Sequence, residues 1–338
     1  MKPRAACADG RAGGARLKVL AAALLGLFAL RVAPANAPVP VLPAPDHTPP
    51  AVASAGRVLL WKVTPPSDAG GVLYLLGDAR ARREPVSELD PVVEAAFQSA
   101  DVLVVEVNTL QLDEGELGRQ AYARGVLRGG QSLPRVLGPE LYARLSTAVR
   151  DLGYPAGSFD AYEPWLASLT LSSSALVRLG YDPRYGLDRY LLERARMGKR
   201  VVALESGQRR IELLDGMAFG AQRLLLAETL DEIDRFAESL DEIFAVCNAG
   251  DASALERIVF AELRAKPELE PLYERVYFER NRSMAKQLEA SLLQGGRWFA
   301  VVGAEHLIGE HGIPNLLRQR GFRVEQVRRR SAIARDPV

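Results

Sequence analysis

The sequence predicts an α/β domain with a mixed central sheet, built from N- and C-terminal strands, and a largely helical middle that forms an insertion or a cap. Two observations predict this class. Short apolar runs rich in β-branched residues lie near both ends of the body, at residues 58–63, 72–76, 101–107 and 297–302. Between the third and the last of these runs, apolar residues recur mainly every three or four positions, the spacing of amphipathic helices.

The composition is that of a globular protein. The chain has 338 residues, of which 48% are hydrophobic and 25% charged. Its 43 lysines and arginines almost balance 42 aspartates and glutamates, which gives a net charge of +1. Nucleic-acid binding normally requires a basic surplus, so we expect no nucleic-acid partner.

Residues 1–37 predict a signal peptide or an N-terminal anchor. Basic residues precede an uncharged apolar run at 19–30, and small residues at 33–35 supply a cleavage site. A run of about a dozen residues is short for a ~30 Å hydrocarbon core, which needs about 20. We therefore expect an exported, periplasmic protein. The alternative is an uncleaved anchor ending at Arg31, which would then be the protein's attachment to the membrane.

Three further segments complete the predicted organisation. Residues 38–56 form a proline-rich linker, since seven of the 21 prolines lie between residues 34 and 50 and favour extended backbone. Residues 57–328 form the folded domain. Residues 329–338 form a flexible tail.

The domain begins with two strands, at 58–63 and 72–76, separated by a turn that contains proline and glycine. A helix over 90–99 starts with an Asp-Pro pair, because aspartate caps a helix and proline suits its first turn. A valine-rich strand follows at 101–107.

Residues 224–247 predict one long helix with a continuous apolar face. Most of its acidic residues lie off that face, so we interpret them as a solvated surface and not as a metal cluster. Cys247 lies on the apolar face and is interpreted as core, not as a nucleophile. The other expected elements are helices at 138–152, 164–179 and 185–195, a strand at 200–204, helices at 252–263 and 271–293, a strand at 297–302, a helix at 313–321 and a strand at 322–327.

Four of the predicted strands end in residues that can carry chemistry. These ends are Gly77-Asp78-Ala79-Arg80, Glu106, Glu205 and Gly303-Ala304-Glu305-His306. Ligand sites in α/β folds gather at the carboxyl ends of strands, and a glycine there allows a sharp turn or a close backbone approach. The strand ends are therefore the expected place of a functional site.

Cysteine and histidine are rare, with only Cys7, Cys247, His47, His306 and His311. Cys7 and His47 precede the folded body, so a four-ligand Cys/His zinc site is excluded by counting. His311 lies in a Gly-Glu-His-Gly turn and is interpreted as a surface residue. The sequence contains no nucleophile elbow, phosphate-binding loop or dinucleotide fingerprint.

An ordered set of short motifs runs from residue 58 to residue 327. The motifs are Leu60-Trp61-Lys62-Val63, Tyr74-Leu75-Leu76-Gly77, Val104-Val105-Glu106-Val107, Pro164-Trp165-Leu166, Tyr185-Gly186-Leu187-Asp188, Leu204-Glu205, Glu279-Arg280-Asn281 and Gly303-Ala304-Glu305-His306-Leu307. Together they resemble the TraB/GumN family, which includes the Tiki metalloproteases. The resemblance implies an α/β core in which two Gly-x-x-His motifs, glutamates and arginines surround a divalent-metal hydrolytic site.

The resemblance also implies roles for individual residues. His306 becomes a metal ligand or a base, Glu106 and Glu205 become catalytic carboxylates, and Arg280 becomes a partner for an oxyanion or a substrate charge. These four side chains are expected to converge on one cleft. Asp188 is a candidate for ligand binding, although an aspartate at a helix start also serves as a cap.

The sequence departs from the family pattern at Arg80, where the first motif has histidine. Arginine is a permanent donor and cannot ligate a cation. Asp78 is a candidate for the missing ligand, because residues two apart in an extended segment point the same way. The remaining ligand set of His306, Asp78 and Glu106 is rich in oxygen and favours manganese, magnesium or cobalt over zinc.

Three functions remain open, and Arg80 is the residue that discriminates between the first two. The first is an exported, metal-dependent hydrolase that acts on a peptide or a similar amide. The second is a non-catalytic envelope protein that binds an anionic ligand or a protein partner in the same cleft, lined by Arg80 and Arg280. The third is haem binding, with His306 as the axial ligand.

Overall fold

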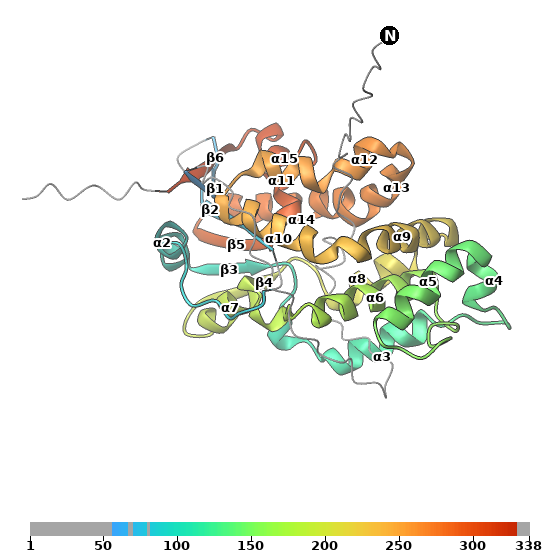
Figure 1. Cartoon of the computed structure of the whole chain (residues 1–338). Helices are drawn as coiled ribbons and strands as arrows, with labels where there is room; N and C mark the ends of the chain where they lie inside the picture. The colour runs from blue at the N-terminus through green and yellow to red at the C-terminus, as the bar shows by residue number, and fades with distance from the viewer. Residues whose placement is uncertain (1–55, 67–69, 80–81, 330–338) are drawn as a thin grey trace, which may run out of the picture.

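The computed structural model describes residues 56–66, 70–79 and 82–329 (Figure 1). The predicted signal segment, almost all of the linker and tail, and Arg80 therefore lie outside the described residues. None of the helices in this part of the chain combines the length and the apolar character that a bilayer crossing requires.

Six strands form one mixed sheet in the described part of the chain, which confirms the predicted fold class. They are β1 (Arg57–Thr64), β2 (Val72–Asp78), β3 (Val102–Val105), β4 (Arg200–Ala203), β5 (Arg297–Gly303) and β6 (Arg323–Arg328), in the spatial order β4-β3-β5-β2-β1-β6. β2, β3, β4 and β5 are parallel, whereas β1 pairs antiparallel with β2 and β6. The C-terminal strand β5 thus lies between the N-terminal strands β2 and β3, and β6 pairs with β1 at one edge.

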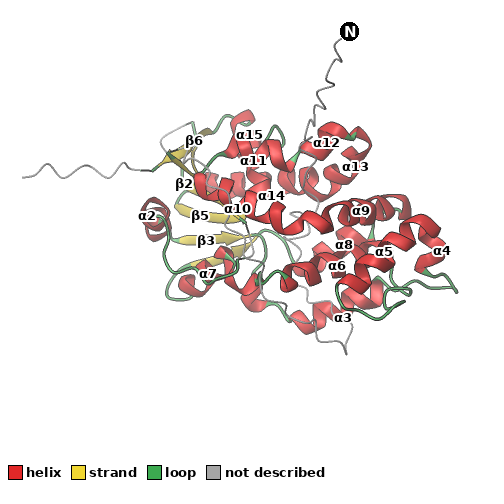
Figure 2. Cartoon of the chain, in the orientation of Figure 1, coloured by secondary structure: helices red, strands yellow, loops and turns green. Residues whose placement is uncertain are grey.

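Helices cover both faces of the sheet (Figure 2). Successive residues of a strand point to opposite faces, so neighbouring leucines of β1 join different cores. Leu60 packs in the core formed with α2 (Pro91–Ser99) and α7 (Leu187–Ala195), whereas Leu59 belongs to the larger core that includes α10 (Phe236–Ala249). The sheet is therefore the middle layer of the domain.

The middle of the chain forms a helical lobe beyond the carboxyl ends of the central strands (Figure 1). Its helices are α3 (Glu114–Arg124), α4 (Leu133–Leu137), α5 (Pro139–Asp151), α6 (Pro164–Arg178), α8 (Gly207–Asp215) and α9 (Phe219–Glu232). α6 is buried along most of its length and packs against α9, so it forms the centre of the lobe. α3, α4 and α8 are not among the predicted helices. α4 has only five residues, and α3 buries only Leu117 and Ala121, so both give a weak periodic signal.

The single helix predicted over residues 224–247 is wrong. α9 ends at Glu232, a 3₁₀ turn spans Ile233–Arg235, and α10 begins at Phe236. The break separates two packing partners, because α9 packs on α6 in the lobe while α10 packs on β1 of the sheet. Both helices keep the three-to-four spacing, so periodicity alone does not reveal the break.

The helices predicted over residues 252–263 and 271–293 are also subdivided. The first consists of α11 (Ala252–Val259) and α12 (Ala261–Ala265). The second region contains α13 (Glu270–Tyr273), a π-helical turn (Glu274–Phe278) and α14 (Glu279–Leu293), which follow one another directly, and α15 (Ile313–Gln319) precedes the last strand. π-Helical turns inside α-helices occur frequently at functional sites, which draws attention to the start of α14.

The parallel strands determine where the residues at their ends meet. β2, β3, β4 and β5 run in one direction, so their last residues emerge at the same edge of the sheet. β2 and β5 are direct neighbours, with Asp78 opposite Gly303. The two strand-glycine motifs of the sequence therefore leave the sheet side by side.

Candidate functional site

Three of the predicted site residues lie just beyond strands at this carboxyl edge. Glu106 follows β3 directly, Glu205 lies two residues beyond β4, and His306 lies in the 3₁₀ turn Ala304–Leu307 that continues β5. Arg280 reaches the same place from the first turn of α14. The structure thus brings the four side chains together, while their catalytic roles stay predictions.

Glu106 is at the centre of this group and is buried. Its Oε1 accepts a hydrogen bond of 2.7 Å from the backbone N–H of Gly303, which ties the end of β3 to the end of β5. Its Oε2 accepts from Nη2 of Arg280 and from Nη2 of Arg210, each at 2.8 Å. Such charge-assisted bonds are the strong class of hydrogen bond, so Glu106 is held from three directions.

Arg280 connects the two predicted carboxylates. Its Nε donates to both carboxylate oxygens of Glu205, at 3.0 and 3.2 Å, and its Nη2 donates to Glu205 Oε2 at 2.8 Å. The Nη1 donates to the carbonyl of Val276, one helical turn earlier, at 3.2 Å. The Nε and Nη2 donors of the planar guanidinium therefore orient Glu106 and Glu205. The predicted role of Arg280 at an oxyanion stays untested, and these contacts give it a positioning role.

Arg210 is a member of the cluster that the sequence analysis did not single out. It lies in α8, whose first turn is capped by the hydroxyl of Ser206 accepting from the Arg209 N–H at 3.1 Å. Besides its bond to Glu106, its Nε lies 3.7 Å from Glu205 Oε2. The sequence signal that indicates its burial is its spacing, because Arg210 lies three and four residues before Leu213 and Leu214 and shares the buried side of α8 with them.

His306 is completely buried, at 0% exposure. Its Nδ1 lies 2.5 Å from Oδ1 of Asn281, the residue after Arg280 on α14. Its Nε2 faces two carboxylates, 3.8 Å from Glu106 Oε1 and 3.9 Å from Glu305 Oε1. The ring also meets Tyr277 edge-on, with 5.9 Å between ring centroids. The histidine is thus fixed on one side by an amide and faces acidic groups on the other.

Glu305 and Asn281 are two more site residues that were not predicted. Both are buried, and both are immediate chain neighbours of predicted residues within quoted motifs. Burial, followed by the charge of Glu305, raises the pKa of Tyr277 well above its usual value. With Glu305 included, three carboxylates face two guanidiniums, so the described part of the cluster has an acidic excess.

Asp78 and Asp188 lie at the N-terminus of α7. Asp78 Oδ2 accepts from the backbone N–H groups of Leu187 and Asp188, at 3.0 and 3.4 Å, and Oδ1 lies 3.8 Å from Nη2 of Arg82. A carboxylate at a helix N-terminus satisfies backbone donors and is favoured by the helix dipole. Asp78 therefore caps a helix more than a hundred residues away in sequence and positions α7 against the sheet.

Gly77, the residue before Asp78, lies close to the turn that follows β5. A Cβ on Gly77 would lie 3.1 Å from the Cα of Ala304 and 3.2 Å from Cδ1 of Leu307. The end of β2 therefore approaches the turn that carries His306 too closely for a side chain to fit without displacement.

The predicted metal ligands do not form a binding set in this arrangement. Within the described residues, no group of three or more His, Cys, Asp or Glu side chains is placed to hold a metal ion. Both oxygens of Glu106 already accept hydrogen bonds, and Asp78 is engaged by α7 and Arg82. Arg80 lies outside the described residues, so the predicted effect of the missing histidine is not addressed by the structure.

Two other residues have the environments that the sequence suggested. Cys247 packs against the larger core, and burial, followed by the charges of Asp78 and Glu305, raises the pKa of its thiol. A thiol in that state is a poor nucleophile. His311 is exposed in its turn, with its ring 4.3 Å from that of Phe278.

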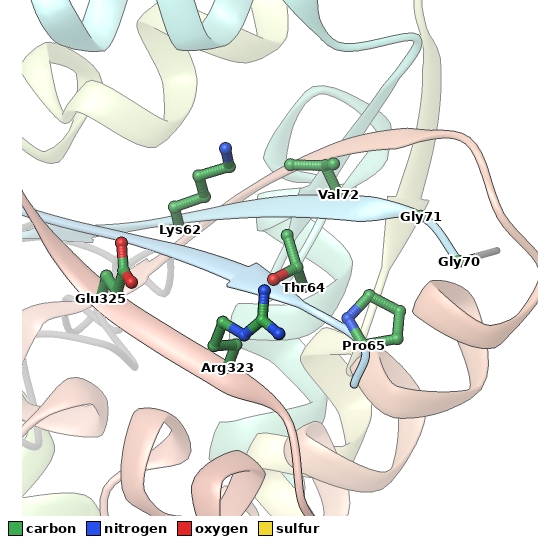
Figure 3. Close-up of a pocket in the computed structure, with 8 residues that line it drawn as sticks. All are labelled: Lys62, Thr64, Pro65, Gly70, Gly71, Val72, Arg323 and Glu325. Atoms are coloured by element: carbon green, nitrogen blue, oxygen red, sulfur yellow. The ribbon is translucent and has the colours of Figure 1, made fainter. Parts of the chain in front are cut away.

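A cavity of about 320 Å³ lies at the opposite end of the strands (Figure 3). Lys62 and Thr64 of β1 and Arg323 and Glu325 of β6 line it, together with residues 70–72. Figure 3 shows these side chains coming from neighbouring strands. β1 runs antiparallel to β2, so this cavity is separated from Glu106 and His306 by the length of the sheet. It contains none of the predicted site residues.

The fold and the cluster define a class: an α/β protein with buried carboxylates, arginines and a histidine at the carboxyl edge of its parallel strands. The chain belongs to the TraB/PrgY/gumN family, whose model matches residues 59–326. The match includes both ends of the sheet and the whole helical lobe.

The chain is also similar to individual proteins. It is 23% identical over 256 residues to Uncharacterized protein YbaP of Escherichia coli (strain K12), which covers 72% of this chain and 87% of that protein. It is 26% identical over 197 residues to Metalloprotease TIKI2 of Danio rerio, which covers 50% of this chain and 38% of that protein. No solved structure matches the chain significantly.

We expect Arg280→Met to lower the free energy of unfolding by about 3–5 kcal/mol, because it leaves the buried Glu106 and the half-buried Glu205 with less compensating charge. Urea unfolding followed by circular dichroism measures the loss. Adding Glu205→Gln should recover part of it, since the second change removes one of the uncompensated charges.

Arg282→Met is the matched control for this prediction. Arg282 lies two residues further along α14, is exposed and pairs with Glu274. Its loss should cost less than about 1 kcal/mol, as for other exposed pairs. Equal costs for the two arginines would contradict the importance assigned to the buried network.

Proposed function

We propose that this protein is an exported hydrolase that acts on peptides or similar amides, with its reaction centre at His306 and Glu106. The observation that carries the proposal is the buried contact of one histidine with two carboxylates at the carboxyl edge of the parallel strands. Sites in α/β folds lie at such edges. Family membership and the similarity to a protein named a metalloprotease support the same class of reaction.

The chemistry follows from the orientation of the side chains. Nε2 of His306 takes a proton from water as the water oxygen bonds to the amide carbon, and the carboxylates of Glu106 and Glu305 stabilise the imidazolium that forms. The imidazolium then gives the proton to the leaving nitrogen as the C–N bond breaks. Glu205, Arg210 and Arg280 keep Glu106 in place. No step of this proposal passes through a metal ion, because the described residues do not fit one.

The alternative functions receive less support from the described residues. An anionic ligand would need spare positive charge, but Arg210 and Arg280 are already held by glutamates. A haem needs an axial histidine with room for the macrocycle, whereas Nε2 of His306 faces Glu106 and Glu305 at less than 4 Å. The hydrolase is therefore the function that the geometry favours.

A peptide library digested with the purified protein and read by mass spectrometry tests the proposal. His306→Ala should lower the rate of cleavage by at least about 100-fold, the usual worth of a general base. His311→Ala is the matched control and should leave the rate within about twofold, since His311 is exposed. Cleavage that survives in His306→Ala, or a folded wild type that cleaves no peptide with or without added Mn²⁺, would rule out the proposed centre.

The metal dependence expected from the family is tested at Arg80. A fixed cation repels a divalent ion by about 4 kcal/mol per unit charge at 4 Å with an effective dielectric near 20. We therefore expect weak Mn²⁺ or Co²⁺ binding by the wild type and much tighter binding by Arg80→His, measured by calorimetry. Adding His306→Ala should abolish the gain. Tight binding by the wild type that His306→Ala leaves intact would contradict the assignment.

Export is tested with a fusion of residues 1–50 to a reporter enzyme that is active only outside the cytoplasm. The basic start and the apolar run at 19–30 should direct the reporter out of the cytoplasm and make it active. A fusion with Leu24→Arg and Leu25→Arg is the control, because charge in the apolar run should block export. An inactive wild-type fusion would show that the segment has another role.

A further inference from the structure

We propose that Asn281 is the positioning residue that fixes the tautomer of His306, with the proton on Nδ1 and a lone pair on Nε2 facing Glu106 and Glu305. The inference adds a positioning residue to the proposed reaction centre, and the role of that residue in catalysis rests on the proposed function. The hydrogen-bond geometry that carries it is independent of any substrate.

The first step is the orientation of the Asn281 amide. Asn281 is completely buried and its Nδ2 donates to the backbone carbonyl of His311 at 2.8 Å. A carbonyl oxygen can only accept, so the NH₂ group must face His311. The Oδ1 of Asn281 is therefore the atom that faces His306, and it can only accept as well.

The second step is the proton on the imidazole. Nδ1 of His306 lies 2.5 Å from Oδ1 of Asn281. An acceptor at that distance requires a donor opposite it, so Nδ1 must carry hydrogen. In the neutral ring the other nitrogen, Nε2, then holds the lone pair. The free histidine side chain favours the opposite tautomer, with hydrogen on Nε2, so the protein selects the less common form.

The third step is the surroundings of Nε2. The nearest oxygens of Glu106 and Glu305 lie 3.8 and 3.9 Å away, beyond hydrogen-bond distance. Neither contact therefore requires a hydrogen on Nε2. A base that takes a proton from water needs this lone pair, with carboxylates near enough to stabilise the charge that follows.

Helix α14 carries both Arg280 and Asn281, so one helix orients the glutamates at the ends of β3 and β4 as well as His306. Consecutive residues on an α-helix point about 100° apart. Arg280 can thus reach the ends of β3 and β4 while Asn281 reaches the turn after β5. The π-helical turn Glu274–Phe278 ends two residues before Arg280.

Selective ¹⁵N labelling of histidine tests the inference. The chain has three histidines, so His306→Ala and His311→Ala assign every ring signal. At neutral pH the wild-type His306 should show hydrogen on Nδ1 and an unprotonated Nε2. Asn281→Leu should lose that pattern, because leucine offers no acceptor to Nδ1.

Asn315→Leu is the matched control. It removes another amide-to-carbonyl hydrogen bond, from Asn315 Nδ2 to the carbonyl of Glu310, and should leave the His306 signals unchanged. Thermal melting confirms that each variant is folded. Hydrogen on Nε2 in the wild type, a doubly protonated ring, or an unchanged pattern in folded Asn281→Leu would overturn the inference.

Kinetics separate this inference from the proposed function. On any peptide that the wild type cleaves, Asn281→Leu should lower kcat by about 10- to 100-fold, as expected for a group that orients a functional histidine, with KM nearly unchanged. If the tautomer is as expected and no peptide is cleaved, the hydrolase proposal fails while the role of Asn281 stands.

Discussion

The carboxylate of Glu106 is the point on which the site depends. It receives the Gly303 N–H from the end of β5 and guanidinium groups from α8 and α14, so one side chain joins two strands and two helices. Charges are costly to bury unless they are paired and hydrogen-bonded. Their pairing is weak evidence for stability, because apolar residues of the same volume often serve equally well. What the network provides is a fixed relative position for residues that lie far apart in sequence.

The topology explains why these residues share one edge. β3, β4 and β5 are parallel neighbours or near-neighbours, and each connection between them passes through helices on one side or in the lobe. Arg210 links α8 of the lobe to the end of β3, and Arg280 links α14 to the ends of β3 and β4. Asp78 has a similar function at β2, where it holds the N-terminus of α7 against the sheet. The site is therefore assembled from several distant segments, each fixed by a polar contact at its end.

The sequence predicted the strands and the place of the site better than it predicted the partners within it. Apolar runs and terminal glycines mark strand ends, which made Glu106, Glu205 and His306 visible. Arg210 and Asn281 are helical residues whose neighbours look ordinary, because their functional contacts come from chain segments far away. The same limit applies to the break between α9 and α10, which depends on packing partners and not on local spacing. Local pattern reveals elements, whereas the contacts between elements require the fold.

The pairing of β2 with β5 brings together two of the strand-end motifs that the sequence contains. Asp78 lies opposite Gly303, so the motif that begins at Gly77 and the motif that ends at His306 leave the sheet from neighbouring strands. A histidine in both motifs would offer two neutral ligands to one ion. In this chain the first motif has Arg80, and the described carboxylates at this edge are already held by other groups: Glu106 by Arg210 and Arg280, and Asp78 by the N-terminus of α7. Guanidinium and backbone N–H groups therefore supply the positive partners that a bound ion would otherwise provide.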